Sequence, residues 1–156
     1  MEELKQNKPF EHLEEEVFLN LQRTAQFLST AAAEVFKSVE LTSVQYNVLR
    51  ILRGSLETGL LCGEISERLV TKDSDITRLL DRLEARELVV RERHAKDRRA
   101  VVSKITKKGL EILAELDDPM IDAVKKQFAH LDKKRLKELN DLLVLARENG
   151  KEKENL

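Results

Sequence analysis

The chain has 156 residues, 41% of them hydrophobic and 37% charged, and its formal net charge is −1. This length suits one domain with a sizeable core, and the low count of five Gly and two Pro favours a helix-rich fold. No apolar run approaches the roughly 20 residues of a membrane span, and the charged N-terminus lacks the apolar segment of a signal peptide. We therefore expect a single cytoplasmic domain over residues 1–156.

The number and spacing of cysteines and histidines exclude disulfide-rich proteins and the common metal-binding motifs. One Cys rules out an intramolecular disulfide framework and a cysteine-based metal site. The three histidines are scattered, without a pair four residues apart that would place two ligands on one helical face. We expect no metal and no cofactor. Local spacing indicates no nucleophile–base pair, phosphate-binding loop or carboxylate dyad, so an enzyme is not expected.

A long first helix is predicted over residues 10–39. Leu13, Val17, Leu21 and Leu28 recur at helical spacing, and Phe18 and Phe36 are among the residues that widen the apolar stripe. This is more apolar surface than one helix of this length needs. It has two interpretations, burial within its own domain or packing on a second chain, and we favour the second.

Two shorter helices follow. Thr42 and Gln45 stand at capping-box spacing, which predicts a helix that ends near Arg53. Residues 54–59 form a connection, and a short helix over 62–69 buries Ile65 and Leu69. A tight turn at 70–73 leads to the next helix, whose N-cap is expected at Asp73 or a neighbour. Two helices joined by such a turn match helix-turn-helix geometry.

The stretch from Thr71 to Lys108 organises the chain. Ile76, Leu79, Leu80 and Leu83 form one apolar stripe, and the opposite face is polar. The apolar runs 88–90 and 101–102 then read as strands around a polar hairpin tip at 94–99. A helix followed by a two-stranded ribbon is the arrangement of a winged helix-turn-helix, in which the helix enters a DNA major groove and the ribbon follows the backbone.

Two helices are predicted after the wing. Thr106 can cap the first of them, and Pro119 within its apolar run predicts a break or kink, because proline removes a backbone donor and clashes with the preceding turn. Asp132 can cap the last helix, in which Leu136, Leu139 and Leu143 line one side.

Charge supports a nucleic-acid interface locally. Between Lys72 and Lys108, twelve Lys and Arg oppose seven Asp and Glu, a net charge of +5 in a nearly neutral chain. Such a cationic island fits a footprint for phosphate. The alternative is a solvated, charged helix and hairpin without a nucleic-acid partner.

Two segments resemble a known family. ITRLLDRLEARELVVRERHAKDRRAVVSKITKKG and LTSVQYNVLRIL are similar to the recognition helix, wing and second helix of the MarR-type winged-helix transcriptional regulators. The order of elements matches over about residues 10–147. One departure is Glu87, where the family usually has Gly. A Glu forced to positive φ there would cost roughly 1 kcal/mol, so the turn can differ in detail.

The resemblance implies a mainly α fold with a small β-wing. It implies a winged helix-turn-helix lobe over 41–106, and dimerisation helices over 10–39 and 107–147. The expected function is a sequence-specific, double-stranded DNA-binding transcriptional regulator, a ligand-responsive repressor that binds a pseudo-palindromic operator as a homodimer. A different class, a winged-helix dimer used only for protein association, stays open, and salt-dependent binding to duplex DNA would separate the two.

Eleven residues are candidates for DNA contact. By the resemblance, Arg99 enters the minor groove and Asp97 orients the wing, in agreement with the attraction of a narrow groove for a guanidinium. Arg78 can bind guanine bidentately, and Asp75 would repel phosphate unless it accepts from a cytosine amine or assists the helix N-terminus. The other candidates are Ser74 and Thr77 for bases or phosphate, Arg82 for the backbone, and Lys72, Arg93, Lys96 and Arg98 for phosphates.

Three further residues have less specific interpretations. Cys62 belongs to the helix-turn-helix without close basic neighbours in sequence, and we expect it to be a packing residue. Members of the family often bind small aromatic or phenolic ligands in a cleft between the dimer helices and the DNA-binding lobe. His12 and Arg23 could line such a cleft, although solvent exposure explains them equally well, and the ligand stays unidentified.

Overall fold

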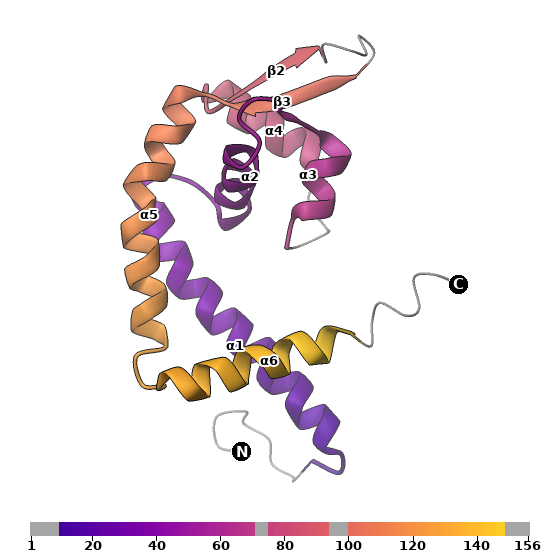
Figure 1. Ribbon diagram of the computed structural model, residues 1–156, viewed down its shortest axis with the longest axis vertical. Coiled ribbons are helices and arrows are strands. Elements are labelled where there is room, and N and C mark those ends of the chain that lie inside the picture. The colour runs from indigo at the N-terminus through magenta and orange to yellow at the C-terminus, as the bar shows by residue number, and fades with distance from the viewer. Residues whose placement is uncertain (1–9, 71–74, 94–99, 149–156) are drawn as a thin grey trace, which may run out of the picture.

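The computed structural model describes residues 10–70, 75–93 and 100–148. Figure 1 shows a winged lobe, built from the short helices and the sheet, joined to a frame of three long helices. In chain order the elements are α1 (Leu13–Phe36), the 3-10 helix η2 (Lys37–Val39), α2 (Ser43–Arg53), β1 (Leu60–Leu61), α3 (Cys62–Arg68), α4 (Ile76–Ala85), β2 (Val89–Arg93), β3 (Val101–Ile105), α5 (Lys107–Gln127) and α6 (Lys133–Glu148).

The core lies in the winged lobe. The predicted stripe of Ile76, Leu79, Leu80 and Leu83 is buried as expected, and it packs with α2, α3, β2 and the first half of α5 in one cluster. Phe36 at the end of α1 joins this cluster, where its ring lies 4.6 Å from that of Tyr46. The lobe is therefore the part of the chain that buries its own apolar surface.

The sheet has one strand more than predicted. β2 and β3 form the expected antiparallel hairpin, with Arg91 opposite Ser103, and β1 adds to the other side of β3 through Leu60 and Ser103. β1 has two residues, too few for an alternation of apolar and polar side chains to be visible in the sequence.

Three predicted helix caps are confirmed. Thr42 accepts a hydrogen bond from the Gln45 amide at 3.2 Å, and the Gln45 side chain accepts one from the Thr42 amide at 2.9 Å. Thr106 accepts from Gly109 at 3.1 Å, and Asp132 accepts from Arg135 at 2.8 Å. These bonds satisfy amides that lack a partner in the first helical turn.

Of the break or kink predicted at Pro119, the break is wrong, because α5 continues through the proline from Lys107 to Gln127. Leu113 and Leu116 are buried before the proline, and Met120 packs against the core directly after it. Tertiary packing on both sides stabilises the helix, so the loss of one backbone hydrogen bond does not end it.

Candidate nucleic-acid interface

Helix α4 begins one residue after Asp75, which is its N-cap in place of the predicted Asp73. The Asp75 carboxylate accepts a hydrogen bond from the Arg78 amide at 3.2 Å. Of the roles considered for Asp75, the structure supports assistance to the helix N-terminus. A carboxylate there also opposes the positive end of the helix dipole.

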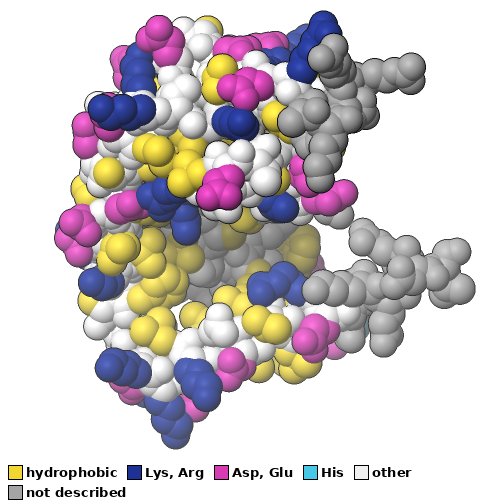
Figure 2. Space-filling model, turned by 45° about the horizontal axis from the view of Figure 1, so that its top comes forward, with side chains coloured by type: hydrophobic (Ala, Val, Ile, Leu, Met, Phe, Trp, Pro, Cys, Tyr) yellow, Lys and Arg dark blue, Asp and Glu magenta, His cyan; other side chains and the backbone are white. Residues whose placement is uncertain are grey.

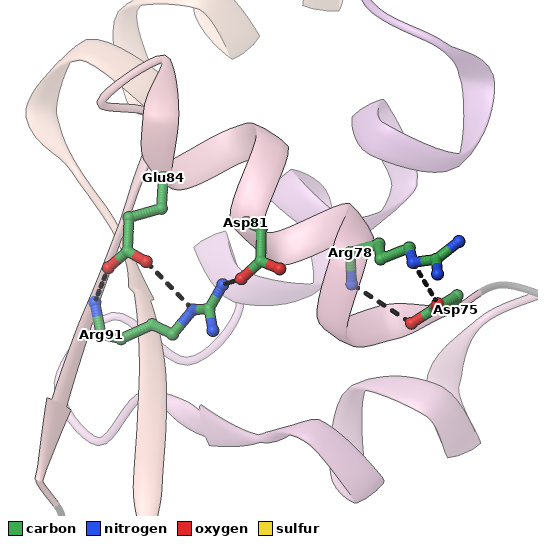
Figure 3. A network of polar contacts seen from close by, with 5 residues as sticks. All are labelled: Asp75, Arg78, Asp81, Glu84 and Arg91. Atoms are coloured by element: carbon green, nitrogen blue, oxygen red, sulfur yellow. Dashed lines mark hydrogen bonds and ion pairs between the residues drawn. The ribbon is translucent and has the colours of Figure 1, made fainter.

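The exposed face of α4 carries three of the predicted DNA-contacting residues. Thr77, Arg78 and Arg82 are exposed, and the two arginines stand four residues apart, one turn along the helix. Arg78 is 80% exposed and its Nε lies 3.2 Å from Asp75 Oδ2, a contact drawn in Figure 3. A surface pair of this kind is worth under about 1 kcal/mol. Arg78 can therefore exchange this carboxylate for a base edge at little cost.

The wing lies beside α4. Arg93 is exposed at the end of β2, next to the hairpin tip. Across the ribbon, Lys104 Nζ forms an ion pair with Glu92 Oε2 at 2.9 Å. Six of the predicted DNA-contacting residues lie outside the described residues: Lys72, Ser74, Lys96, Asp97, Arg98 and Arg99.

One arginine that the sequence analysis did not assign joins the wing to α4. Arg91 of β2 contacts Asp81 through Nη2, and its Nε lies 3.3 Å from Glu84 Oε2 (Figure 3). The signal that could have found it is the alternation along β2, which places Arg91 on the same face as the buried Val89.

The base of the wing is a tight junction. Glu87 adopts φ +60°, so the left-handed turn is kept although the residue is not glycine. The Thr106 hydroxyl donates to the Glu87 carbonyl at 2.7 Å, and Lys108 Nζ lies 3.1 Å from Glu87 Oε2. At Gly109, an added Cβ would stand 2.5 Å from the Leu88 carbonyl oxygen. Close approach therefore requires glycine at position 109.

A second junction ties α4 to the first helix. Arg86 directly follows α4, and its guanidinium donates to the carbonyls of Glu40 at 2.6 Å and Val39 at 2.8 Å. These carbonyls lie at the end of η2, where Glu40 adopts φ +52°. The guanidinium satisfies acceptors at a helix C-terminus and fixes the end of α4 against the long helices.

A cleft separates the winged lobe from the long helices, and Figure 2 shows this hollow with hydrophobic side chains on its walls. One pocket of about 560 Å³ lies between α2 and α5, and its lining includes Tyr46, Arg50, Arg53, Asp117 and Lys125. The lining also includes apolar Met120, Ile121 and Val124, so it combines apolar side chains with three cations and one carboxylate. Its volume lies within the range of small-molecule pockets in proteins.

Arg53 and Asp117 pair within this pocket. Two hydrogen bonds, of 2.7 and 3.1 Å, join the guanidinium to the carboxylate. The hydrogen bond from Arg53 lowers the pKa of Asp117 below its ordinary value, and the same bond raises the pKa of Arg53. The pair connects α2 of the winged lobe with α5 of the helical frame.

A second pocket of about 530 Å³ lies among α1, the end of α5 and α6. Arg23 lines it together with Phe27, His130 and Leu139. This pocket lies among the long helices, whereas the cleft predicted for Arg23 lies between those helices and the DNA-binding lobe, so the role of Arg23 there stays a prediction. His12 occupies the N-cap position of α1 and is exposed, and it is not among the residues that line this pocket.

The long helices expose apolar side chains. Phe36 is the one buried residue of α1 in the described chain. The side chains of Leu13 and Phe18 on α1 are 71% and 58% exposed, and that of Leu142 on α6 is 64% exposed. Surfaces of this kind are typical of protein interfaces.

Cys62 is exposed, so its prediction as a packing residue is wrong. It is the first residue of α3, and the core side of that short helix is taken by Ile65. Within the described ranges, groups of three or more acidic, His or Cys side chains suited to a metal ion are absent. The described helices also include none that is long and apolar enough to cross a membrane.

Comparison with known proteins decides the family. A sequence model of the MarR family matches residues 40–100. The HTH-type transcriptional repressor MdtR of Bacillus subtilis (strain 168) is 33% identical over 104 residues, which are 65% of this chain and 64% of that repressor. The crystal structure of a MarR transcription factor from Planctomyces limnophilus is 37% identical, with a TM-score of 0.66, and the match covers 88% of this chain and 99% of that one. The chain belongs to the MarR family.

More distant structures share the fold of this MarR-family chain. The organohalide-sensing transcriptional regulator RdhR-CbdbA1625, in its 2,4-dichlorophenol-bound form, has a TM-score of 0.81 at 17% identity, over 93% of this chain and 88% of that one. The predicted fold class, mainly α with a small β-wing, is thereby confirmed, as is the resemblance to this family.

Proposed function

We propose that this MarR-family chain is a transcriptional regulator that binds double-stranded DNA sequence-specifically, as a homodimer on a pseudo-palindromic operator. The observation that carries the proposal is the exposed face of α4, where Arg78 and Arg82 project one turn apart beside the wing while the opposite face is buried. A helix so presented fits the major groove, and its guanidiniums match guanine edges and phosphates.

The wing completes the proposed interface. Arg93 at the end of β2 neutralises a phosphate, as do Lys72, Lys96 and Arg98, while Arg99 enters the minor groove with Asp97 orienting the hairpin tip. Ser74 and Thr77 contact bases or phosphates at the helix start. Support for these roles comes from the position of the hairpin beside α4 and from the cationic balance of residues 72–108.

Two copies assemble through the long helices. The long helices expose large apolar side chains that no other part of the described chain buries: Leu13, Val17 and Phe18 on α1, and Leu142 and Leu145 on α6. A second copy of the chain buries these side chains, because a two-fold axis places the same surface of both copies in contact. The same axis presents two α4 helices to successive major grooves.

The regulator is proposed to repress and to respond to a small ligand. Repression is supported by the similarity to MdtR, named a transcriptional repressor. The pocket between α2 and α5 is lined by Tyr46, Arg50 and Lys125 besides the paired Arg53 and Asp117, so two cations remain over that pair and the pocket suits an aromatic anion. A ligand there acts by favouring a different spacing of the two α4 helices, within the limit of its differential affinity for the two arrangements.

Duplex selection tests the proposal. The full chain is incubated with a random pool of duplexes, and the enriched sequence is titrated against a scrambled duplex at several salt concentrations. We expect an enriched inverted repeat, stronger binding to it than to the scrambled duplex, and a steep fall in affinity with salt. Absence of salt-dependent binding to either duplex would favour the alternative of a protein-association module.

A thermal-shift assay tests the ligand. Benzoate should raise the melting temperature of the chain and weaken its binding to the selected duplex, because the anion binds one arrangement of the lobes. Benzyl alcohol, which lacks the charge, serves as the control and should do neither at the same concentration. Equal effects of the two compounds would exclude the cationic side chains of the pocket as the recognition element.

A further inference from the structure

Arg91 lies between two carboxylates of the recognition helix. Its Nη2 contacts Asp81 Oδ1, its Nε lies 3.3 Å from Glu84 Oε2, and its backbone amide donates to Glu84 Oε1 at 3.2 Å (Figure 3). Asp81 and Glu84 are three residues apart, so both lie on the edge of α4 that faces β2. One side chain therefore holds two adjacent turns of the helix.

The strand geometry explains why Arg91 is available for this contact. Val89 of β2 is buried, and Arg91, two residues later, points to the same face of the strand. Its partner on β3 is Ser103, which is buried, so the guanidinium lies where the core face of the sheet passes over α4. The Arg91 side chain is only 22% exposed.

We propose that Arg91 is a positioning residue for DNA recognition, which sets the placement of α4 against the wing and does not itself contact DNA. The inference rests on the proposed function. A guanidinium is planar. Nη2 of Arg91 donates to Asp81, whereas Nε makes an ion-pair contact with Glu84 without a hydrogen bond of its own among the described residues. The two contacts, one turn apart on α4, constrain both the rotation and the tilt of the helix. A lysine at this position would supply charge without the planar guanidinium.

The same contact prepares the surface for phosphate. Asp81 and Glu84 lie on the exposed side of α4, within the range over which charges interact with a nearby DNA backbone. Asp81 and Glu84 together carry a charge of −2, and the guanidinium of Arg91 reduces the net charge of the three residues to −1. The arrangement thus offsets repulsion while the arginines on the other edge of α4 remain free to turn toward DNA.

The test uses the full chain with two probes, the duplex that the wild type selects from a random pool and a scrambled duplex of equal length. We expect Arg91→Met to lower the ratio of selected to scrambled affinity about tenfold, roughly the discrimination that one bidentate base contact supplies. The two carboxylates left without Arg91 should in addition weaken both duplexes by a similar factor, while the slope of affinity against salt stays close to the wild-type value, because no phosphate contact is removed. Arg91→Lys should not restore the ratio.

Arg93→Met is the matched control, since Arg93 lies two residues along the same strand and is exposed. It should weaken both duplexes about equally and reduce the salt slope by about one phosphate per subunit. If Arg91→Met behaves like this control, Arg91 contacts DNA itself and the proposal is wrong. An unchanged ratio in a folded Arg91→Met variant, or full recovery in Arg91→Lys, also overturns it.

Asp81→Asn supplies an independent test should Arg91→Met fail to fold. Removal of a negative charge near DNA should by electrostatics alone strengthen binding to both duplexes. The positioning role predicts instead that the ratio of selected to scrambled affinity falls, because the neutral amide of Asn holds the guanidinium less strongly than the carboxylate does. A ratio at or above the wild-type value overturns the proposal. If the wild type enriches no sequence from the random pool, the proposed function is wrong. If it does enrich one but the variants keep the wild-type ratio, only the positioning role of Arg91 is wrong.

Discussion

Arg53 of α2 and Asp117 of α5 form a bidentate pair across the junction of the winged lobe and the helical frame, with hydrogen bonds of 2.7 and 3.1 Å. Their side chains are 35% and 40% exposed, so solvent screens the pair and its contribution to stability is at most about 1 kcal/mol. The pair links α2 to α5 at the residue that directly follows Leu116, the last buried residue of α5.

The pair gives folding stability a dependence on pH. The Arg53 hydrogen bond holds the pKa of Asp117 below its ordinary value of 3.8, so the contribution is fully present above that value and is lost as pH falls through the lowered one. We expect Asp117→Asn to lower the free energy of unfolding relative to wild type at pH 7, and the difference to shrink below about pH 4. Urea titrations at several pH values measure it. A constant difference down to about pH 2 would contradict the assignment.

Gly109 should tolerate no side chain. A Cβ there would lie 2.5 Å from the Leu88 carbonyl and 2.7 Å from Ile105, so we expect Gly109→Ala to destabilise the fold by about 1–3 kcal/mol. Gly63→Ala is the matched control, because its Cβ would meet no atom within 4 Å in a helix. It should be neutral or stabilising by up to about 1 kcal/mol. Thermal unfolding of both variants checks the contrast.

Self-association should depend on the exposed apolar side chains of α1. Sedimentation at low micromolar concentration should give about twice the chain mass of 18.0 kDa, and Phe18→Asp should shift the population to monomers, because a charge in an apolar interface is costly. Asn20→Asp, on an exposed position of the same helix, controls for added charge alone. A stable wild-type monomer would contradict both the homodimer and the palindromic operator.

The helix and the wing should fail differently on DNA. Arg78→Ala should cost roughly 1–3 kcal/mol on the selected duplex and relax preference at one base pair per half-site. Arg99→Ala should cost more on duplexes with A·T-rich flanks than on G·C-rich ones, because a narrow minor groove attracts the guanidinium. Anisotropy titrations against the selected duplex, a version with one base pair changed in each half-site, and versions with A·T-rich and with G·C-rich flanks distinguish the two variants. If both variants lose the same affinity on every duplex, residues 72–108 form a nonspecific cationic surface and the proposed base and minor-groove contacts are wrong.

Local patterns in the sequence accounted for most of the helices. The stripe from Ile76 to Leu83 and the caps at Thr42, Thr106 and Asp132 were predictable, because helical periodicity and capping involve residues within one or two turns. The exposure of Thr77, Arg78 and Arg82 follows from the same periodicity. The two strands of the wing were also visible as apolar runs, since β-rich segments differ in period from helices.

Contacts between distant segments needed the tertiary structure. Three contacts of arginine join separate segments of the chain. Arg91 contacts Asp81 and Glu84, Arg86 donates to carbonyls at the end of η2, and Arg53 pairs with Asp117. Each contact depends on how α2, α4, β2 and α5 pack. The sequence determined which elements form and which faces they bury, because those depend on near neighbours. Only the tertiary structure decided that α5 continues through Pro119, that Cys62 is exposed, and which carboxylates pair with Arg91 and Arg53. These features depend on packing between segments that are far apart in the chain.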